Sequence, residues 1–457
     1  MIALKNGADS STKQKSSSTN ESSNAKTLHA AATNFLDRLK NDENHKLRNI
    51  IVAADTLSDA YIELAFQTPP APSRKTKAAP AVPIAKNLRL ARVTHLPIPV
   101  VTADYPVSVS CDYSDLPTIV EFKKEYTLVG GINAPKVLIC CGSDGKDYKQ
   151  LIKGGSDDLR QDATLSNVFH ITNILLKKNF ETRRRGLSVR TYKVVPLGQR
   201  AGVIEWVDNT TPFGEYLTSA HARYRKSDMS SLEARKKMMQ EHEREGSTPQ
   251  SKLQTYLEIE SQFLPVFRHF FFESFRDPAV WLVKPRTNYT RSTAVTSIMG
   301  WIIGLGDRHP QNTLIDRTTG VIIQIDLGIA FDQGKLLSTP ELVPFRLTRD
   351  IVDAMGSTGI EGIFRRCCEE TLVVARKEAN IIYTILDVFR YDPLYNWKGA
   401  QSKNRDSVHS GKNIEAERAL VGVRRKLSEA LSVECQINEL FLCAMNKENL
   451  SKLYPGW

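Results

Sequence analysis

The chain has 457 residues, of which 41% are hydrophobic, and its 62 Lys and Arg outnumber its 51 Asp and Glu. This length exceeds one ordinary domain and supplies enough apolar side chains for more than one packed core. The net charge of +11 suits polyanions such as nucleotides, phosphoproteins or nucleic acid, although many plain soluble surfaces are equally basic.

The cysteine content and the hydropathy of the sequence indicate in which cellular compartment the protein is expected. The seven cysteines include no C-x-x-C pair, which argues against both a disulfide framework and a zinc site. No apolar run approaches the ~18 residues that a membrane helix needs, and no secretory signal opens the chain. We therefore expect a reducing compartment, the cytosol or the nucleus, and no membrane association.

The first part of the chain changes character twice. Residues 1–27 are rich in serine, so we expect them to be disordered. Residues 28–68 have the period of a helix, and the predicted apolar stripe, which should dock on a partner surface, consists of Leu47, Ile50, Ala54, Leu57, Tyr61 and Leu64. Residues 69–88 contain five prolines and are predicted to be a linker.

The remainder is predicted to form two lobes and a tail. Residues 89–207 are rich in strand patterns, interrupted by one helix that opens at DDLRQDA, residues 157–163. Residues 208–395 are mainly helical, residues 396–424 are a polar linker, and residues 425–457 are amphipathic. The fold class is therefore α+β, with a small β-rich N-lobe before a larger helical C-lobe.

The motif GLGDRHPQN, residues 304–312, has the spacing of a phosphoryl-transfer site. Asp307 precedes Asn312 by five residues, and Asp326 follows fourteen residues later at the end of the predicted strand VIIQID. In such sites one Asp accepts the proton of the attacking hydroxyl, and the Asn and a second Asp hold Mg²⁺. His309 can contact the transferring phosphoryl group. Taken singly, these residues are equally consistent with turns, a strand end and a structural hydrogen bond.

The N-lobe offers candidate phosphate contacts. Lys153 ends a predicted strand and can bind the phosphates of a nucleotide. Asp157 or Asp162 can hold the Lys153 ammonium group in place. The alternative for the acids after Lys153 is capping of the helix that follows. The segment VGGINAPK, residues 129–136, which includes Pro135, is either a lid over the phosphates or a plain hairpin loop.

An adenine slot is predicted where the strand pattern gives way to helix, at residues 205–207. The Glu205 carbonyl and the Val207 amide, on either side of Trp206, can read the base. Tyr192 can partner Asp162 deep in this slot. The residues expected to sandwich the base, each of which is equally consistent with a core position, are Ile132, Leu314 and Ile325.

The motifs GLGDRHPQN, IDLG, KGGSDDLRQDA and TYKVVPL together resemble those of the phosphatidylinositol 3-kinase-related protein kinases. The segment from Phe331 to Glu369 is most similar to the ataxia-telangiectasia mutated (ATM) branch. Residues 425–457 resemble the family's C-terminal FATC segment, and residues 28–68 resemble the end of its helical FAT region. Family members are several times longer, so we expect this chain to be a portion of one, an unusual gene product or the result of a wrongly assigned gene start.

The resemblance implies a bilobal kinase fold and a non-specific serine/threonine protein kinase that uses ATP with Mg²⁺ or Mn²⁺. It assigns Asp307 and His309 to catalysis, Asn312 and Asp326 to the metal, and Lys153 to the phosphates. It also implies protein substrates phosphorylated at Ser or Thr before Gln, in nuclear DNA double-strand-break signalling and telomere maintenance. The implied partners are a double-strand-break sensor complex, DNA indirectly, and a second copy of the chain.

Two alternative functions remain. A lipid kinase of the same fold needs clustered cations in its activation loop, whereas the segment from Asp326 to Pro344 has Lys335 as its one basic residue, beside Asp332 and Glu341. A non-catalytic pseudokinase scaffold would lack the lysine and metal positions, which are present here. The sequence therefore favours an active kinase with protein substrates.

Overall fold

A computed structural model describes most of the chain and divides it into two compact units. The first unit is Met1–Ser166 with Tyr192–Val207, and the second is Asn167–Thr191 with Asp208–Trp457. The described residues are 19–68, 81–105, 109–110, 112–113, 115–130, 134–155, 158–337, 339–391, 414–453 and 455–456, with the side chains of 19–29, 281–282, 391 and 414–415 left aside.

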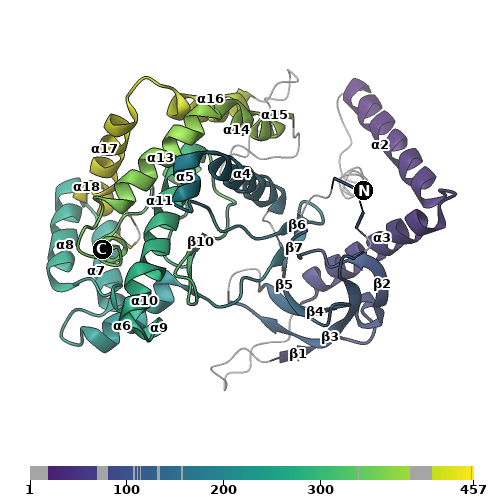
Figure 1. Ribbon diagram of the computed structural model, residues 1–457, viewed down its shortest axis with the longest axis horizontal. Coiled ribbons are helices and arrows are strands. Elements are labelled where there is room, and N and C mark those ends of the chain that lie inside the picture. Colours follow the sequence, from purple (N-terminus) through teal and green to yellow (C-terminus); the bar gives the residue numbers. More distant parts are fainter. Residues whose placement is uncertain are drawn as a thin grey trace. The chain divides into compact units, whose positions relative to one another are not determined.

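The first unit is built on a seven-stranded sheet whose order is β1-β3-β4-β5-β7-β6, with β2 also paired to β3 (Figure 1). Every pairing is antiparallel. Asp144 and Gly145 lie in the turn that joins β4 to β5. The strands are β1 (Ala81–Pro83), β2 (Thr94–Pro99), β3 (Thr118–Leu128), β4 (Lys136–Gly142), β5 (Asp147–Gly154), β6 (Val194–Pro196) and β7 (Ala201–Glu205).

Two boundaries predicted in this region are wrong. The predicted linker 69–88 contains β1, which pairs with β3 and so belongs to the sheet; its residues 69–80 lie outside the described ranges. The predicted disordered segment 1–27 overlaps α2 (Thr19–Lys40), which begins at Thr19, while residues 1–18 are not described. The serine content concealed the helix because it lowers helix propensity without abolishing it.

The single helical stretch expected at 28–68 is two helices, because Asn44 ends the break between them and caps α3 (His45–Phe66). Its side chain accepts hydrogen bonds from the amides of Lys46 and Leu47. The predicted stripe is correct only in its second half: Leu57, Tyr61 and Leu64 are buried, whereas Leu47 and Ile50 are 39% and 40% exposed.

Helix α3 packs on the sheet and is held there by buried polar groups. The Tyr61 hydroxyl donates to Gln150 Oε1 over 2.6 Å, and Gln150 Nε2 donates to Thr102 Oγ1 over 3.1 Å. At the end of the helix the buried Lys136 ammonium donates to the Ala65 carbonyl over 3.1 Å. A cation at this position also complements the negative end of the helix dipole.

The second unit is mainly helical and contains a small antiparallel sheet of order β10-β9-β8. Helix α11 (Pro285–Ile303), which packs along α13, is buried over most of its length, polar residues included. The sheet strands are β8 (Thr210–Pro212), β9 (Thr313–Asp316) and β10 (Ile322–Gln324). The helices before the tail are α4 (Leu159–Lys178, whose first half belongs to the first unit), α5 (Phe180–Arg184), α6 (Phe213–Tyr224), α7 (Ser231–Glu243), α8 (Pro249–Gln262), α9 (His269–Ser274), α10 (Pro278–Val283), α12 (Arg349–Asp353), α13 (Ile363–Lys377), α14 (Ala379–Leu386) and α15 (Val388–Tyr391).

The tail folds onto this unit as α16 (Ile414–Leu427), α17 (Val433–Ala444) and α18 (Lys447–Leu450). Helix α16 begins inside the predicted linker 396–424, so that prediction is wrong from Ile414 onward; residues 392–413 are not described. Leu450 and Leu453 join a core with α7 and α8 whose other members are Ala234, Met238, Tyr256, Ile259 and Phe263. Burial of these side chains attaches the chain's last residues to the helical unit.

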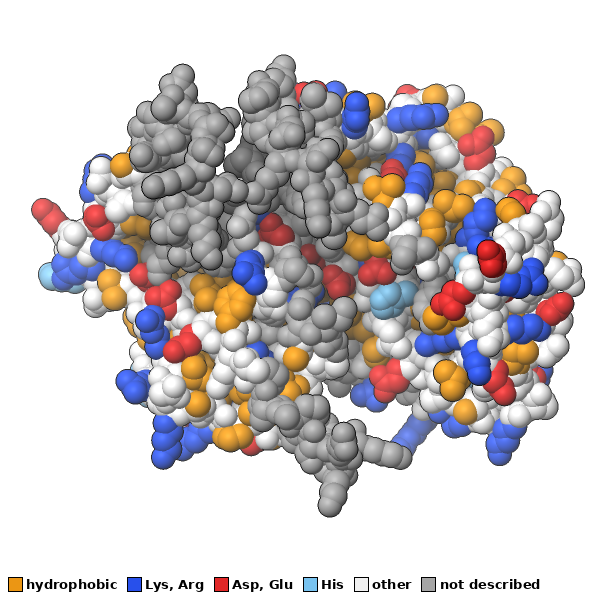
Figure 2. Space-filling view, turned by 180° about the vertical axis from the view of Figure 1, so that it is seen from behind, with side chains coloured by type: hydrophobic (Ala, Val, Ile, Leu, Met, Phe, Trp, Pro, Cys, Tyr) orange, Lys and Arg blue, Asp and Glu red, His pale blue; other side chains and the backbone are white. Residues whose placement is uncertain are grey.

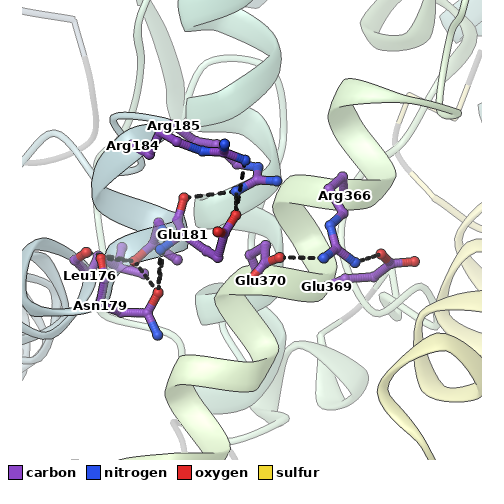
Figure 3. A network of polar contacts seen from close by, with 9 residues as sticks. Leu176, Asn179, Glu181, Arg184, Arg185, Arg366, Glu369 and Glu370 are labelled. Atoms are coloured by element: carbon purple, nitrogen blue, oxygen red, sulfur yellow. Dashed lines mark hydrogen bonds and ion pairs between the residues drawn. The ribbon is translucent and has the colours of Figure 1, made fainter.

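A polar network lies where α5 meets α13 (Figure 3). Arg366 pairs with Glu369 over 3.1 Å and with Glu370 over 2.7 Å. On α5, the Glu181 carboxylate accepts from Arg184 over 3.1 Å and also from Arg185. Each of these pairs lies within one helix or its cap, so the charges at this meeting point are compensated locally.

The positive net charge does not gather into one patch on the face shown in Figure 2, where Lys and Arg are interspersed with Asp and Glu. The six cysteines within the described ranges are free thiols: Cys140, Cys141, Cys367, Cys368, Cys435 and Cys443. None of the described helices has the length and apolarity needed to cross a bilayer.

The packing of α3 predicts unequal effects for two apolar truncations. Leu64→Ala should lower the free energy of unfolding of the first unit by about 2–5 kcal/mol, because it empties a fully buried site. Ile50→Ala, at a position 40% exposed, should change it by about 0.5 kcal/mol or less. Urea unfolding followed by tryptophan fluorescence and circular dichroism measures both. Equal losses would contradict the observed orientation of α3.

Candidate active site

The loop 304–312 begins where Gly304 ends α11 with a left-handed conformation, φ +64°. A Cβ at Gly304 would stand 2.4 Å from the Asp332 nitrogen, and one at Gly306 would stand 2.7 Å from the Gly334 Cα. Three backbone hydrogen bonds of 2.9 Å join residues 303–306 to residues 329–332. The two glycines of the motif are therefore required because another backbone segment crosses directly over them.

Asp307 and Asn312 are joined by their side chains. The buried Asn312 Nδ2 donates to the Asp307 carbonyl over 3.0 Å and to Asp307 Oδ2 over 3.2 Å. Asp307 itself has φ +55°, a conformation uncommon outside glycine but tolerated by Asp. His309 Nε2 lies 3.9 Å from Asp307 Oδ1, and its Nδ1 accepts from the Gln311 amide over 3.1 Å. The loop thus presents an acid, an imidazole and an amide together.

Asp326 is held beside the loop 304–312, although that loop follows α11 and Asp326 follows β10. The Ile325 amide donates to the Asn312 carbonyl over 3.0 Å. The Arg308 guanidinium donates to the carbonyls of both Ile325, over 3.0 Å, and Asp326. Asp326 has φ +57° and its side chain is exposed. The structure therefore brings Asp307, Asn312 and Asp326 to one place in the second unit.

The donor set at this place suits a hard divalent cation. The Asn312 amide nitrogen points at Asp307, which leaves its carbonyl oxygen as the free end of the group. Together with the Asp326 carboxylate it offers two oxygen ligands, and Mg²⁺ is usually held by one or two protein ligands, with water and phosphate completing the shell. Within the described ranges no set of three His, Cys, Asp or Glu side chains could hold a metal. Asn312 and Asp326 therefore suit a Mg²⁺ ion whose remaining ligands are water and phosphate, and not a metal enclosed by protein side chains alone.

Glu341 and Arg346 both contact the backbone of Arg308 in the loop 304–312. The motif GLGDRHPQN alone did not reveal these two residues. The half-buried Glu341 carboxylate accepts from the Arg308 amide over 2.9 Å. Arg346 donates to the Arg308 carbonyl and, through its other end, to the Pro455 carbonyl of the tail. Arg346 follows the segment 326–344 in the sequence, but its partners lie far away along the chain. These contacts connect the tail to the candidate catalytic loop.

The electrostatics of the loop keep the imidazole neutral. Burial lowers the pKa of His309, Asp307 opposes this shift, and the neighbouring Arg346 and Arg308 lower the pKa further. Burial also lowers the pKa of Arg346 to about 10, so that it stays charged at neutral pH. The pKa of Glu341 is raised, again chiefly by burial. A neutral His309 can donate or accept one hydrogen bond without adding positive charge.

The first unit carries the predicted phosphate-binding residues. Lys153, on β5, is half-buried, and its neighbour across the ladder is Gly202 of β7. Because side chains alternate along a strand, Lys153 lies on the face opposite to the buried Gln150 and Ile152. Asp162 in the first turn of α4 is buried. Asp157 lies outside the described ranges.

The predicted adenine residues are distributed over both units. In the first unit, Glu205 ends β7 and its carboxylate accepts from the Lys193 amide over 3.0 Å; the Trp206 amide donates to the Lys149 carbonyl over 3.1 Å. Val207 is buried there as well. The remaining residues are the buried Tyr192 and half-buried Pro135 of the first unit, the half-buried Leu314 and Ile325 of the second, and Ile132, which is not described.

The chain has clear relatives. Residues 148–399 match the family model described as phosphatidylinositol 3- and 4-kinase. The chain is 42% identical to a serine/threonine-protein kinase tel1 of Neurospora crassa and 43% identical to a serine-protein kinase ATM of Sus scrofa, with 93% of this chain covered in each case. It spans about 15% of the length of either relative.

A solved structure, the FAT and kinase domain of CtTel1, shares the fold with a TM-score of 0.84 and 44% identity, covering 95% of this chain and 30% of that one. CtTel1 has also been solved as a complete dimer with C2 symmetry. This likeness confirms the predicted α+β, bilobal kinase fold, with a strand-rich unit and a mostly helical one.

The electrostatic surroundings of His309 predict a measurable shift. Asp307→Asn should lower the pKa of His309 further, because the substitution removes the negative charge that raises it. NMR titration of the imidazole protons measures the value, with Asp316→Asn, outside the group of charges that act on His309, as the control. A rise in the pKa, or equal shifts in the two variants, would contradict the arrangement described.

Proposed function

Because the chain belongs to the phosphatidylinositol 3- and 4-kinase family, we propose that it is a non-specific serine/threonine protein kinase. It transfers the γ-phosphate of ATP to serine or threonine hydroxyls of protein substrates. The observation that carries this proposal is the convergence of Asp307, Asn312 and Asp326, from one loop and one strand end, through the Ile325–Asn312 hydrogen bond. The names of the relatives, both protein kinases, agree with it.

Four residues of the candidate site each have a role in this proposed reaction. Asp307 orients the substrate hydroxyl and accepts its proton as the oxygen attacks the phosphorus. Neutral His309, beside Asp307, can hydrogen-bond the transferring phosphoryl oxygens. Asn312 and Asp326 hold Mg²⁺, or Mn²⁺ in its place, which neutralises charge on the phosphates. Most of the catalysis is then positioning and electrostatic stabilisation.

The first unit supplies the nucleotide contacts in this proposal. Lys153 binds the phosphates, and Asp157 or the buried Asp162 holds its ammonium group. The Glu205 carbonyl and the Val207 amide read adenine beside Trp206. The apolar or aromatic neighbours of the nucleotide are Ile132, Pro135, Tyr192, Leu314 and Ile325. The strand position of Lys153 supports this, since the opposite face of β5 is already occupied by α3.

The segment 326–344 favours a protein over a lipid substrate. Its one basic residue, Lys335, lies 3.8 Å from Asp332 Oδ1. Glu341 is committed to the Arg308 amide. An anionic lipid head group would therefore meet more negative than positive charge along this segment, whose acids are Asp326, Asp332 and Glu341. The pseudokinase alternative is disfavoured because the lysine, Asn and both Asp positions carry groups suited to the chemistry.

We extend the proposal to the cellular role on the resemblance to the ATM branch. The chain, or the longer protein of which it is a portion, then acts in the nucleus in double-strand-break signalling and telomere maintenance. Its partners are a break-sensor complex, with DNA engaged indirectly, and a second copy of itself. The C2-symmetric dimer of CtTel1 supports the homodimer. Serine or threonine followed by glutamine is the expected target.

The metal assignment predicts the outcome of a substrate competition. With Mg-ATP, the chain should phosphorylate a Ser-Gln peptide and not phosphatidylinositol vesicles offered in the same reaction. Asp326→Ala should abolish the transfer because it removes one of two protein ligands to Mg²⁺, while Asp37→Ala, at an exposed position on α2, should not. Radiolabel on lipid alone would overturn the protein substrate, and an unimpaired Asp326→Ala would overturn the metal role.

The proton-accepting role predicts a change confined to turnover. Asp307→Asn should reduce kcat by a factor of roughly 10²–10⁴, the usual contribution of a positioned acid-base group. Nucleotide affinity should be nearly unchanged, because Asp307 is not assigned to the metal or the phosphates. Steady-state kinetics together with a fluorescent ATP-analogue titration separate the two quantities. A loss of affinity with kcat preserved would assign Asp307 to binding instead.

A further inference from the structure

A pocket separate from the candidate active site opens in the helical unit, at the opposite end of α11. Its volume is about 640 Å³ and its walls come from α9, the first turn of α11, α12 and the turn 356–360. Ligand pockets in proteins commonly measure roughly 300–1,000 Å³. Because α11 has 19 residues, about 28 Å of helix separates this pocket from Gly304. The pocket therefore does not belong to the site already described.

Arg286 is the most informative residue of this pocket. It is half-buried, and within the described ranges no carboxylate lies within ion-pair distance of its guanidinium. It lies over the turn at Gly356, where φ is +91° and a Cβ would stand 2.8 Å from Arg286 Nη1. The glycine thus leaves the space that the guanidinium occupies. A partly buried cation without an anionic partner is costly, and an anionic ligand would compensate it.

The other charges that line the pocket do not neutralise Arg286. Asp353 Oδ2 accepts from the Arg268 amide over 2.9 Å, and Asp353 Oδ1 pairs with the Arg268 guanidinium. Both oxygens of the one lining carboxylate are thereby engaged by the same arginine. With two arginines and one aspartate, the described lining has a net charge of +1.

The remaining lining residues named here are apolar or bear hydroxyl groups. Phe272 is 55% exposed, and Val352 and Ile360 are half-buried. Ser357 and Thr358 present exposed hydroxyl groups on the turn beside Gly356. An aromatic ring that is more than half exposed in a concave wall offers apolar area to a ligand. The lining therefore combines a cation, two hydroxyls and an apolar wall.

We propose that this pocket binds a ligand with one anionic group, a carboxylate or a phosphate, on an apolar body. Arg286 binds the anion, with Ser357 and Thr358 as hydrogen-bond donors, and the apolar body lies against Phe272 and Ile360. Such chemistry occurs both in a free small acid and in an acidic or phosphorylated side chain of a peptide. The site is independent of the proposed kinase reaction, since its evidence and its test concern binding alone.

Binding of defined probes to the full chain tests the site. Phenyl phosphate and phenylacetate stand for the free small acids, the peptide acetyl-Phe-Asp-amide stands for the polypeptide source, and benzyl alcohol is the neutral comparison. Ligand-observed NMR titrations should show saturable binding of at least one anionic probe and weaker or no binding of benzyl alcohol. Which probe saturates at the lowest concentration identifies the source.

Matched variants locate the binding. Arg286→Gln, similar in size but neutral, should weaken the best probe by about tenfold or more, since charge-assisted hydrogen bonds are the strong class. Phe272→Ala, at a position 55% exposed, should also weaken it, and Arg276→Gln, exposed and outside the pocket, should not. Thermal melting verifies that each variant is folded. Absence of binding by every anionic probe, or binding insensitive to both pocket variants, would overturn the proposal.

Discussion

The guanidinium of Arg308 is the contact on which the candidate site depends most. The three groups of the candidate site arise from two separate segments, the loop after α11 and the end of β10. Arg308 is buried and donates to the carbonyls of Gly306, Ile325 and Asp326, so that one side chain joins both segments. Removing it would leave buried carbonyls without donors, which costs more than a lost exposed contact.

This loop is also linked to the chain's end. Arg346 contacts the Arg308 carbonyl on one side and the Pro455 carbonyl on the other, while Glu341 accepts the Arg308 amide. The tail in turn is attached to α7 and α8 through Leu450 and Leu453. A short series of polar contacts thereby joins the tail to the loop that carries Asp307 and His309.

The first unit shows a different use of buried polar groups. Helix α3 is attached to the sheet by Tyr61, by Gln150 and by the Lys136 ammonium at its carboxyl end. These contacts occupy one face of the strands. Lys153 consequently lies on the other face, which is the face that a nucleotide can use. The structural lysine and the proposed functional one thus serve opposite sides of the same sheet.

Local pattern was informative wherever a residue's role depends on its neighbours in the chain. The α+β class follows from the strand and helix patterns, and the clustering of Asp307 with Asn312 follows from their spacing, because one turn brings such residues together. The stripe on α3 was only half right, since Ile50 has the helical period but no surface to cover it. The strand β1 and the helix α16 were missed because their proline-rich and polar sequences become ordered only by pairing or packing on distant residues.

The sequence by itself determined the family, the candidate catalytic loop and the residue types that chemistry at this loop requires. Only the tertiary structure decided that Arg308 joins Asp326 to the loop, that Glu341 and Arg346 support it, and that Arg286 lies over Gly356 in a separate pocket. The physical reason is that turns and caps are local interactions, whereas burial and charge pairing join residues tens to more than a hundred positions apart, and no spacing rule encodes those distances.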